Sequence, residues 1–222
     1  PRCEARNAGH AAALAVAKPP PVLAAVDAIP EIDLWNKQSL VDFMKWANIK
    51  LLRAEWLVDA PVADVMKMRQ DLPEEAFVPH DELMSRSIKS LTYAWQSAAH
   101  PDPEGFVALA LKFILRDEVQ LEAVFWDHKC LFQKEMRPEY DPLKGHDFKD
   151  YLVRNRTNEE LLYFQRSLQG MHAFFFADYT EGLIIDKVPS YALNATPYSS
   201  RGWPLMESRA LGLSGETRLV PL

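Results

Sequence analysis

The feature that most constrains the fold is a run of four apolar residues, Ala123, Val124, Phe125 and Trp126, which ends directly at Asp127. A short uninterrupted apolar run is typical of a strand that is buried on both faces, because helices cover both sides of a parallel sheet. Ligands of open α/β sheets bind beyond the carboxyl ends of the strands. The run therefore predicts a central strand, and Asp127 is a candidate binding residue.

A strand and a helix are predicted ahead of this run. Residues 88–95 have the β-branched and aromatic content of a strand. The sequence Pro101-Asp102-Pro103-Glu104 predicts a helix start, with Asp102 as N-cap and Pro103 at the first helical position, and apolar residues follow at helical spacing through residue 114. Together these segments predict a βαβ unit that ends at Asp127.

The second half of the predicted domain begins with a polar, irregular stretch after Gln133, which we interpret as an excursion from the sheet. Thr157-Asn158-Glu159-Glu160 is a capping box for a helix that ends at Gly170. Residues 173–176 (Ala-Phe-Phe-Phe) lie just before Asp178 and predict a third buried strand. Residues 183–185 predict a short strand or turn, 198–211 a helix capped by Ser199 or Ser200, and 217–222 a last strand.

The chain before residue 85 predicts two further regions. Residues 1–30 are rich in Ala and Pro, which favours a tail or linker, and the apolar run at 11–17 is compatible with a remnant of a targeting region. Residues 31–84 predict a helical arm and connector, with one helix over 39–60, a second short helix after Pro61 and a proline-broken connector over 70–81. Trp46, Ile49 and Trp56 lie off the main apolar stripe of the first helix, so the arm has more than one apolar face.

Composition narrows the class of protein. The 222 residues, 48% of them hydrophobic, are enough for one core with an extension, and a net charge of −6 argues against a nucleic-acid partner. Cys3 and Cys130 lie far apart, so we expect no disulfide framework and a reducing compartment such as the cytoplasm or an organelle interior. No window has the 18 apolar residues of a membrane span, so we expect a protein without a transmembrane segment, soluble or peripheral.

Three segments in order resemble the heterokaryon-incompatibility (HET) domain, a relative of the Toll/interleukin-1 receptor (TIR) fold. Leu91-Thr92-Tyr93-Ala94-Trp95 is similar to the first-strand motif of that family. Trp126-Asp127-His128-Lys129-Cys130-Leu131-Phe132-Gln133 resembles its second-strand signature, and residues 198–207, from Tyr198 to Glu207, resemble its closing motif. His100-Pro101-Asp102-Pro103 resembles divergent algal or protist members. The resemblance covers residues 88–222, while the domain itself is expected over 85–222.

The resemblance implies a three-layer α/β fold with a flavodoxin/Rossmann-like parallel sheet of TIR type, here with an N-terminal helical extension. This chain departs from the family pattern at Pro204, which stands where TIR domains commonly carry Cys, and in the long stretch after Gln133. A fifth strand of the family's sheet is also missing from the sequence.

In TIR domains that hydrolyse NAD, the Glu of the closing motif is the catalytic acid, and this role falls on Glu207. A carboxylate near the ribose stabilises the oxocarbenium-like state of glycosidic cleavage. Trp203 and Tyr93 are candidates for stacking on nicotinamide or adenine, and Asp127 for holding a ribose hydroxyl. Arg201 is a candidate for pairing with a phosphate, or with Glu207 or Asp178 in a salt bridge. No cofactor is required; NAD+ would be the substrate.

Each of these residues also has a purely structural interpretation. Glu207 on a helix is compatible with a solvated side chain, Trp203 with a packing residue, and Asp127 and Asp178 with caps at strand ends. His128, Cys130 and His146 do not have the spacing of a known zinc site, and Cys130 as a nucleophile would need a low-pKa environment.

A second function, from another class, remains open. The domain is also compatible with a catalytically inactive interaction module or an accessory subunit of a larger assembly, possibly an organellar one. It would dock on other proteins, or on a second copy of itself, through the arm at 32–68. Fold alone does not decide between the two, because one fold supports many functions.

Overall fold

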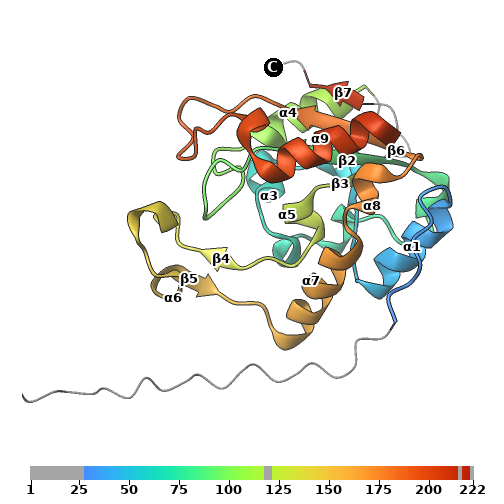
Figure 1. The fold of residues 1–222 in the computed structure, drawn as a ribbon, viewed down its shortest axis with the longest axis horizontal. Coiled ribbons are helices and arrows are strands. Elements are labelled where there is room, and N and C mark those ends of the chain that lie inside the picture. Colours follow the sequence, from blue (N-terminus) through green and yellow to red (C-terminus); the bar gives the residue numbers. More distant parts are fainter. Residues whose placement is uncertain (1–27, 118–121, 215–216, 221–222) are drawn as a thin grey trace, which may run out of the picture.

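The computed structural model describes residues 28–117, 122–214 and 217–220, and its centre is a five-stranded sheet (Figure 1). The strand order is β1 (Leu52–Arg53), β3 (Glu122–Phe125), β2 (Ser87–Tyr93), β6 (Thr180–Ile185) and β7 (Thr217–Leu219). β1 pairs antiparallel with β3, and the other neighbouring pairs are parallel. The protein is therefore a mixed α/β protein with a mostly parallel sheet, compatible with a Rossmann-like fold.

Helices cover both faces of this sheet. Helix α4 (Phe106–Leu115) lies between β2 and β3 along the chain, and α9 (Gly202–Ser214) lies between β6 and β7. The step from β2 to β3 and the step from β6 to β7 run in opposite directions across the sheet. Because crossovers between parallel strands are right-handed, the two helices lie on opposite faces. The four parallel strands lie in the order β3-β2-β6-β7. When they are numbered from 1 to 4 along the chain, this order is 2-1-3-4, as at the start of a flavodoxin-like sheet.

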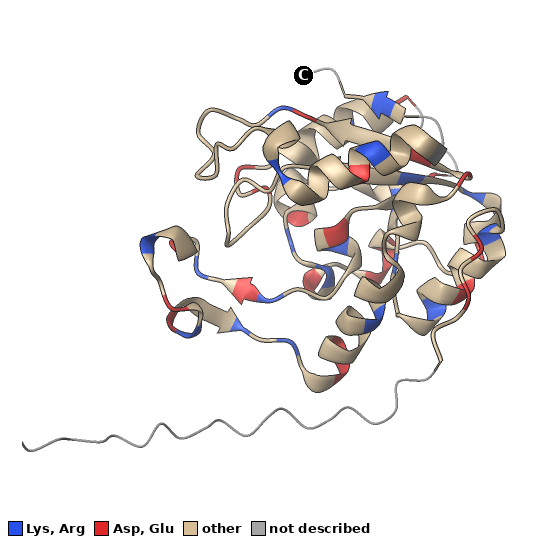
Figure 2. Cartoon of the chain, in the orientation of Figure 1, with Lys and Arg blue, Asp and Glu red and all other residues tan. Residues whose placement is uncertain are grey.

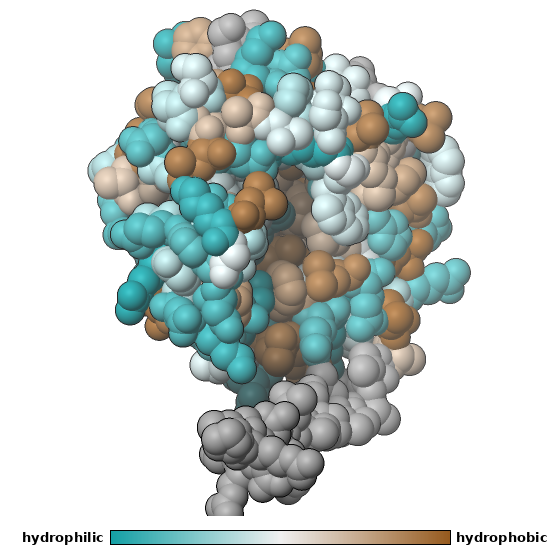
Figure 3. All heavy atoms as spheres, turned by 60° about the vertical axis from the view of Figure 1, so that its left-hand side comes forward, coloured by the Kyte–Doolittle hydropathy of each residue, from teal (hydrophilic) through white to brown (hydrophobic). Residues whose placement is uncertain are grey.

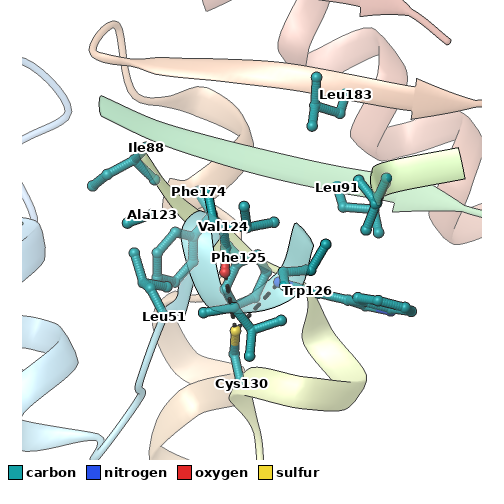
Figure 4. Close-up of a cluster of buried hydrophobic side chains, with 14 of the residues drawn as sticks. Leu51, Ile88, Leu91, Ala123, Val124, Phe125, Trp126, Cys130, Phe174 and Leu183 are labelled. Atoms are coloured by element: carbon teal, nitrogen blue, oxygen red, sulfur yellow. Dashed lines mark hydrogen bonds between the residues drawn. The ribbon is translucent and has the colours of Figure 1, made fainter. Parts of the chain in front are cut away.

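The predicted central strands are confirmed. β2 pairs with β3 on one side and with β6 on the other, and all four residues of β3 are buried. Trp126 follows β3 and is fully buried (Figure 4). Behind it Cys130 lies in the core, where its Sγ donates to the carbonyl oxygen of Val124 at 3.4 Å and accepts from the backbone N–H of Trp126 at 3.3 Å.

The prediction of one helix over residues 39–60 is wrong. Helix α1 (Lys37–Trp46) ends early, strand β1 follows, and α2 (Ala54–Asp59) is a separate helix. Asn48 has a φ of 48° and turns the chain between them. Asn tolerates this left-handed conformation better than other residues with side chains. Pairing of Leu52 with Val124 then provides a strand where periodicity alone indicated a helix.

The prediction of a buried strand at residues 173–176 is also wrong, because these residues form the short helix α8 (Ala173–Phe176). The Phe174 ring stacks on Phe125 at 3.9 Å between centroids, and the Phe174 carbonyl accepts from Ser90 Oγ. A short apolar run does not distinguish a buried strand from a buried helix. The third long parallel strand is β6, whose last residues include the short strand predicted at 183–185.

Two helix starts test the capping predictions. The capping box of Thr157 and Glu160 is confirmed at the start of α7 (Asn158–Gly170). Asp102, in contrast, is not the N-cap of α4, because that helix begins after Gly105, whose φ is 75°. The Asp102 carboxylate still accepts from the backbone N–H groups of Val107 and Ala108, at 3.0 Å each. Asp102 therefore caps the helix from a preceding loop.

The remaining elements are short. They are α3 (Val62–Val65), α5 (Asp127–Cys130), the hairpin of β4 (Glu135–Met136) and β5 (Leu152–Arg154), α6 (Phe148–Tyr151), and the 3₁₀ turns η1 (Arg69–Asp71), η2 (Glu74–Ala76), η3 (Leu83–Ser85), η4 (Pro142–Lys144) and η5 (Tyr198–Ser200). The hairpin and α6 occupy the excursion expected after Gln133. Side chains of α1, β1 and α2 belong to the same hydrophobic cluster as β2 and β3. Residues 1–27 of the tail predicted at 1–30, and residues 221–222 of the last predicted strand, lie outside the described residues.

Acidic and basic residues are interspersed along the chain (Figure 2). Inside, Lys89 of the central strand pairs with Glu122 of β3 at 3.0 Å and with Glu181 of β6. These ion pairs connect the three central strands. No helix within the described ranges has the length and apolar character needed to span a membrane.

The contact between β6 and α9 gives the first prediction. A Cβ built on Gly182 would lie 2.4 Å from a methyl carbon of Leu211, which is buried. We expect Gly182→Ala to lower the free energy of unfolding by about 1–3 kcal/mol through overpacking. Urea denaturation measures the loss, and Leu211→Ala should recover part of it in the double variant.

The matched control lies in the same helix. A Cβ at Gly212 would meet nothing within 4 Å, so Gly212→Ala should raise the free energy of unfolding by about 0.5–1 kcal/mol, the usual helical preference for Ala over Gly. Additive effects of Gly182→Ala and Leu211→Ala would contradict a close approach of α9 to the sheet.

Candidate functional site

A cavity of about 580 Å³ lies at the carboxyl ends of β2 and β3, next to the start of α9. The apolar part of its wall comes from Leu91, Leu131, Phe164, Leu168, Met171, Phe175, Trp203 and Pro204. Its polar part comes from Tyr93, Trp95, Asp127, Gln133, Arg201 and Glu207. The molecular face shown in Figure 3 is hollowed, and apolar residues gather in the hollow.

The five residues predicted as a site all line this one cavity. Tyr93 is the last residue of β2, Asp127 follows β3, and Arg201, Trp203 and Glu207 come from the loop before α9 and from its first turns. The structure thus brings together side chains that lie more than 100 positions apart in the sequence. It does not test the ligand-binding and catalytic roles, which stay predictions.

Asp127 is half-buried and accepts three hydrogen bonds. Its Oδ1 accepts from the Tyr93 hydroxyl at 2.9 Å and from the His128 N–H at 2.6 Å, and its Oδ2 accepts from Trp95 Nε1 at 3.3 Å. Burial raises the pKa of Asp127, although these donors favour the ionised form. The carboxylate therefore fixes the two aromatic side chains at the end of β2.

Glu207 has a different environment, because only one of its oxygens is bound. Its Oε2 accepts from Thr92 Oγ1 at 2.6 Å, while no donor among the described residues is bound to Oε1. Burial raises the pKa of Glu207 to about 7, and the nearby charge of Asp127 adds to this effect. Near pH 7 the side chain is therefore divided between its acid and its carboxylate forms.

Arg201 is held by the backbone. Its Nε donates to Thr196 O at 2.9 Å, its Nη2 to Asn194 O at 2.7 Å, and its Nη1 to Trp95 O. These acceptors are carbonyl oxygens, not the carboxylates of Glu207 or Asp178. Three of the five N–H donors of the guanidinium are thus used: two within the loop before α9, and one that joins this loop to Trp95 beyond β2.

The two aromatic candidates differ in exposure. The Trp203 side chain is 65% exposed, so its indole is open to solvent at the mouth of the cavity and is not a core residue. Tyr93 is buried, and its ring makes an edge contact with Trp126, with 6.0 Å between ring centroids. Trp203 therefore has a face free to stack on a ligand, whereas Tyr93 forms part of the wall.

A larger cavity of about 1010 Å³ lies beside the β4–β5 hairpin, lined in part by His100 and His128. Burial lowers the pKa of His100 to about 4 and that of His128 well below its ordinary value, so both imidazoles are neutral at pH 7. Burial also raises the pKa of Cys130 to about 12, which keeps its thiol protonated. Neither Asp127 nor Glu207 lines this cavity, so we place the candidate site in the smaller one.

Two further features of this region are its His and Cys side chains, as possible metal ligands, and the buried Lys129. No group of three or more His, Cys, Asp or Glu residues suited to a metal occurs in the described ranges. His146 stacks on Tyr151 in the hairpin region. Lys129 is fully buried, and its Nζ donates to the carbonyls of Met66 and Lys67 at 2.8 and 2.9 Å. Burial lowers the pKa of Lys129 to about 7.

Sequence reasoning missed Thr92 and Tyr198 as parts of the site. Thr92 is a buried hydroxyl in β2, and Tyr198 is the first residue of the closing motif. A polar side chain inside a strand whose neighbours are apolar was the available signal, since buried hydroxyls require partners. The apolar wall that α7 contributes through Phe164 and Leu168 was also missed.

Comparison with known proteins gives no match: no family model, no curated protein and no solved structure matches the chain.

The raised pKa of Glu207 predicts that the free energy of unfolding depends on pH. The folded pKa of about 7 lies above the unfolded value of 4.5, so the stabilising effect of the protonated form is lost as pH rises from 4.5 through 7. A tenfold change in proton affinity corresponds to about 1.4 kcal/mol, so the loss is on the order of 3 kcal/mol. We expect Glu207→Gln to gain stability relative to wild type over this range, measured by urea denaturation at pH 4.5, 6 and 7.5.

Glu104→Gln is the control, because Glu104 is exposed and does not line the smaller cavity. At pH 7.5 its effect on stability should be smaller than that of Glu207→Gln. A stability difference between Glu207→Gln and wild type that does not change with pH would show that the Glu207 carboxyl is not desolvated.

Proposed function

We propose that this protein is a TIR/HET-like domain that hydrolyses the nicotinamide–ribose bond of NAD+ or of a closely related nucleotide, with Glu207 as the catalytic residue. One observation carries the proposal. The Glu207 carboxyl lies in a cavity at the carboxyl ends of parallel strands, with one oxygen held by Thr92 and the other unbound. This is the region where ligands of open α/β sheets bind.

The proposed reaction fits a carboxylate in this environment. The bond between the ribose C1′ and the nicotinamide nitrogen breaks, and nicotinamide leaves with the bonding electron pair. Water then adds to C1′ and gives up a proton, so the products are nicotinamide, ADP-ribose and H+. The ribose passes through an oxocarbenium-like state, whose positive charge the ionised Glu207 stabilises at close range.

The other predicted residues have supporting roles in this proposal. Trp203 offers an exposed indole at the mouth of the cavity for stacking on an aromatic ring of the ligand. Arg201 keeps two N–H donors beyond the three bound to carbonyls, and these would serve a phosphate oxygen. Asp127 and Tyr93 would shape the wall near the ribose. The strand order 2-1-3-4 also supports the TIR-like assignment.

An interaction module is the second proposal, and an exposed Trp35 favours it. Trp35 lies just before α1 and is 79% exposed. Trp46 and Trp56, the other tryptophans of the predicted arm, are half-buried against the core. We expect Trp35→Ala to weaken any self-association seen by sedimentation at high concentration. A wild-type chain that stays monomeric there would remove self-association as the use of this surface.

The hydrolase proposal is tested by incubating the purified chain with NAD+ and measuring nicotinamide by chromatography. Glu207→Gln keeps the shape of the side chain but removes its charge, so we expect release to fall by on the order of 100-fold or more. Asp127→Asn would disturb the wall as well, so it is a poorer test.

The control is again Glu104→Gln, which should release nicotinamide at the wild-type rate. A Glu207→Gln variant with undiminished release would exclude Glu207 from the reaction. A wild-type chain without any release, under conditions where it is folded, would leave the interaction module as the better proposal.

A further inference from the structure

A row of polar groups linked by hydrogen-bond contacts leads from Glu207 away from the cavity. Glu207 Oε2 lies 2.6 Å from Thr92 Oγ1, and Thr92 Oγ1 lies 2.9 Å from the Tyr198 hydroxyl. The Tyr198 hydroxyl in turn donates to the carbonyl oxygen of Pro204 at 3.0 Å. Thr92 and Tyr198 are both buried, so the row has little access to bulk water.

The number of protons in this row depends on the state of Glu207. A carbonyl oxygen only accepts, so the Tyr198 proton is used when it donates to Pro204. The contact between Thr92 and Tyr198 is then a hydrogen bond only if Thr92 donates its single proton to Tyr198. In that case the contact between Thr92 and Glu207 is a hydrogen bond only if Glu207 is protonated and donates.

Protonated Glu207 therefore gives three protons for three contacts, and every contact is a hydrogen bond. Ionised Glu207 leaves two protons for the same three contacts, so one contact lacks a proton. Buried polar groups without partners are costly, which means that the row favours the protonated acid.

We propose that Thr92 and Tyr198 are positioning residues that set the protonation state of Glu207: the Thr92 hydroxyl can donate either to Tyr198 or to the Glu207 carboxylate, so Tyr198 favours the protonated acid by accepting the Thr92 proton. Their effect on the carboxyl group is independent of any ligand. Its consequence for the reaction rests on the proposed function, in which the ionised Glu207 acts on the ribose.

Other groups around the row act in ways that do not depend on these two hydroxyls. Asp127 faces Glu207 across the cavity and disfavours its ionisation, and Asp186 acts in the same direction on Tyr198. Ser208 also faces the Tyr198 hydroxyl, and its Oγ donates to Leu205 O at 3.0 Å. Arg201, the cation of this wall, is bound to carbonyls. Substitution of Thr92 or Tyr198 leaves all of these charges in place.

The proposal predicts that two small substitutions are not independent. In Tyr198→Phe the Thr92 proton has lost its other acceptor, so it is always available to the carboxylate and the pKa of Glu207 should fall. Thr92→Val removes the partner of Glu207 in both protonation states and breaks the link to Tyr198, so adding Tyr198→Phe to Thr92→Val should cause no further fall. The fall in Tyr198→Phe alone should be about tenfold in proton affinity, the usual net effect of one hydrogen bond.

The pKa of Glu207 is measured by NMR on protein labelled with ¹³C in the glutamate carboxyl groups, and its signal is identified by its absence in Glu207→Gln. Tyr191→Phe is the matched control, because Tyr191 lines the other cavity and should leave the Glu207 titration unchanged. Thr92→Ser keeps the hydroxyl and should keep the wild-type titration.

A fall of the Glu207 pKa in Tyr198→Phe that is absent when Thr92→Val is also present supports the proposal, because a general loss of packing would not require Thr92. An unchanged or raised pKa in Tyr198→Phe, or an equal fall in the Thr92→Val background, overturns it. If Thr92→Val does not fold, Tyr198→Phe alone decides by the sign of its shift. The titration requires no substrate, so a failure to release nicotinamide would count against the hydrolase and not against this assignment. If release occurs, its pH midpoint should move with the measured pKa.

Discussion

The hydrogen bonds of the Asp127 carboxyl group are the interactions on which the site depends. This group lies where β3 ends and accepts from the Tyr93 hydroxyl and Trp95 Nε1 at the neighbouring end of β2. A half-buried carboxylate requires such donors, since removing one would leave it with too few partners. The same contacts fix the side chains that form the inner wall of the cavity. Strand pairing and the shape of the site are therefore linked through one side chain.

Burial also decides which groups near the site carry charge. Glu207 has its pKa raised to about 7, whereas Cys130 stays a thiol and His128 stays a neutral imidazole. Among these groups only Glu207 has an unbound oxygen on the cavity. The cavity therefore presents Glu207, whose pKa is raised to about 7, beside the hydrogen-bonded carboxyl group of Asp127. Two neighbouring carboxyl groups favour a ligand that is neutral or positive where it contacts them.

The sequence predicted the central part of the fold well and its periphery poorly. The strands at 88–95 and 123–126 were predictable because buried parallel strands have a local signature, and the capping box at Thr157 has one too. The errors at 39–60 and 173–176 have a common cause. In both segments tertiary contacts decide between helix and strand, through the turn at Asn48 and through the packing of Phe174 on Phe125.

The site was partly predictable for a similar reason. The strand-end rule applies to the whole edge of a sheet, so it placed Asp127 and Tyr93 near one another without any knowledge of side-chain packing. The closing motif added Glu207 through resemblance. Neither argument predicts that Thr92 and the apolar residues of α7 belong to the site. Their positions depend on which helix packs against which strand. Likewise, no sequence pattern indicates that Arg201 donates three hydrogen bonds to backbone carbonyls.

The position of Glu207 finally depends on a glycine in the neighbouring strand. Glu207 and Leu211 are four residues apart on α9, so they lie on the same face of that helix. Leu211 packs against Gly182 of β6, where no Cβ would fit, and Glu207 reaches Thr92 of β2. Ser90 and Gly182 are register partners, and so are Thr92 and Ile184, which puts both contacts of α9 on the same face of the sheet. A side chain at position 182 would push α9 outward and lengthen the contact between Glu207 and Thr92. The close approach of helix and sheet is thus a condition for both the stability of this layer and the protonation state of the acid.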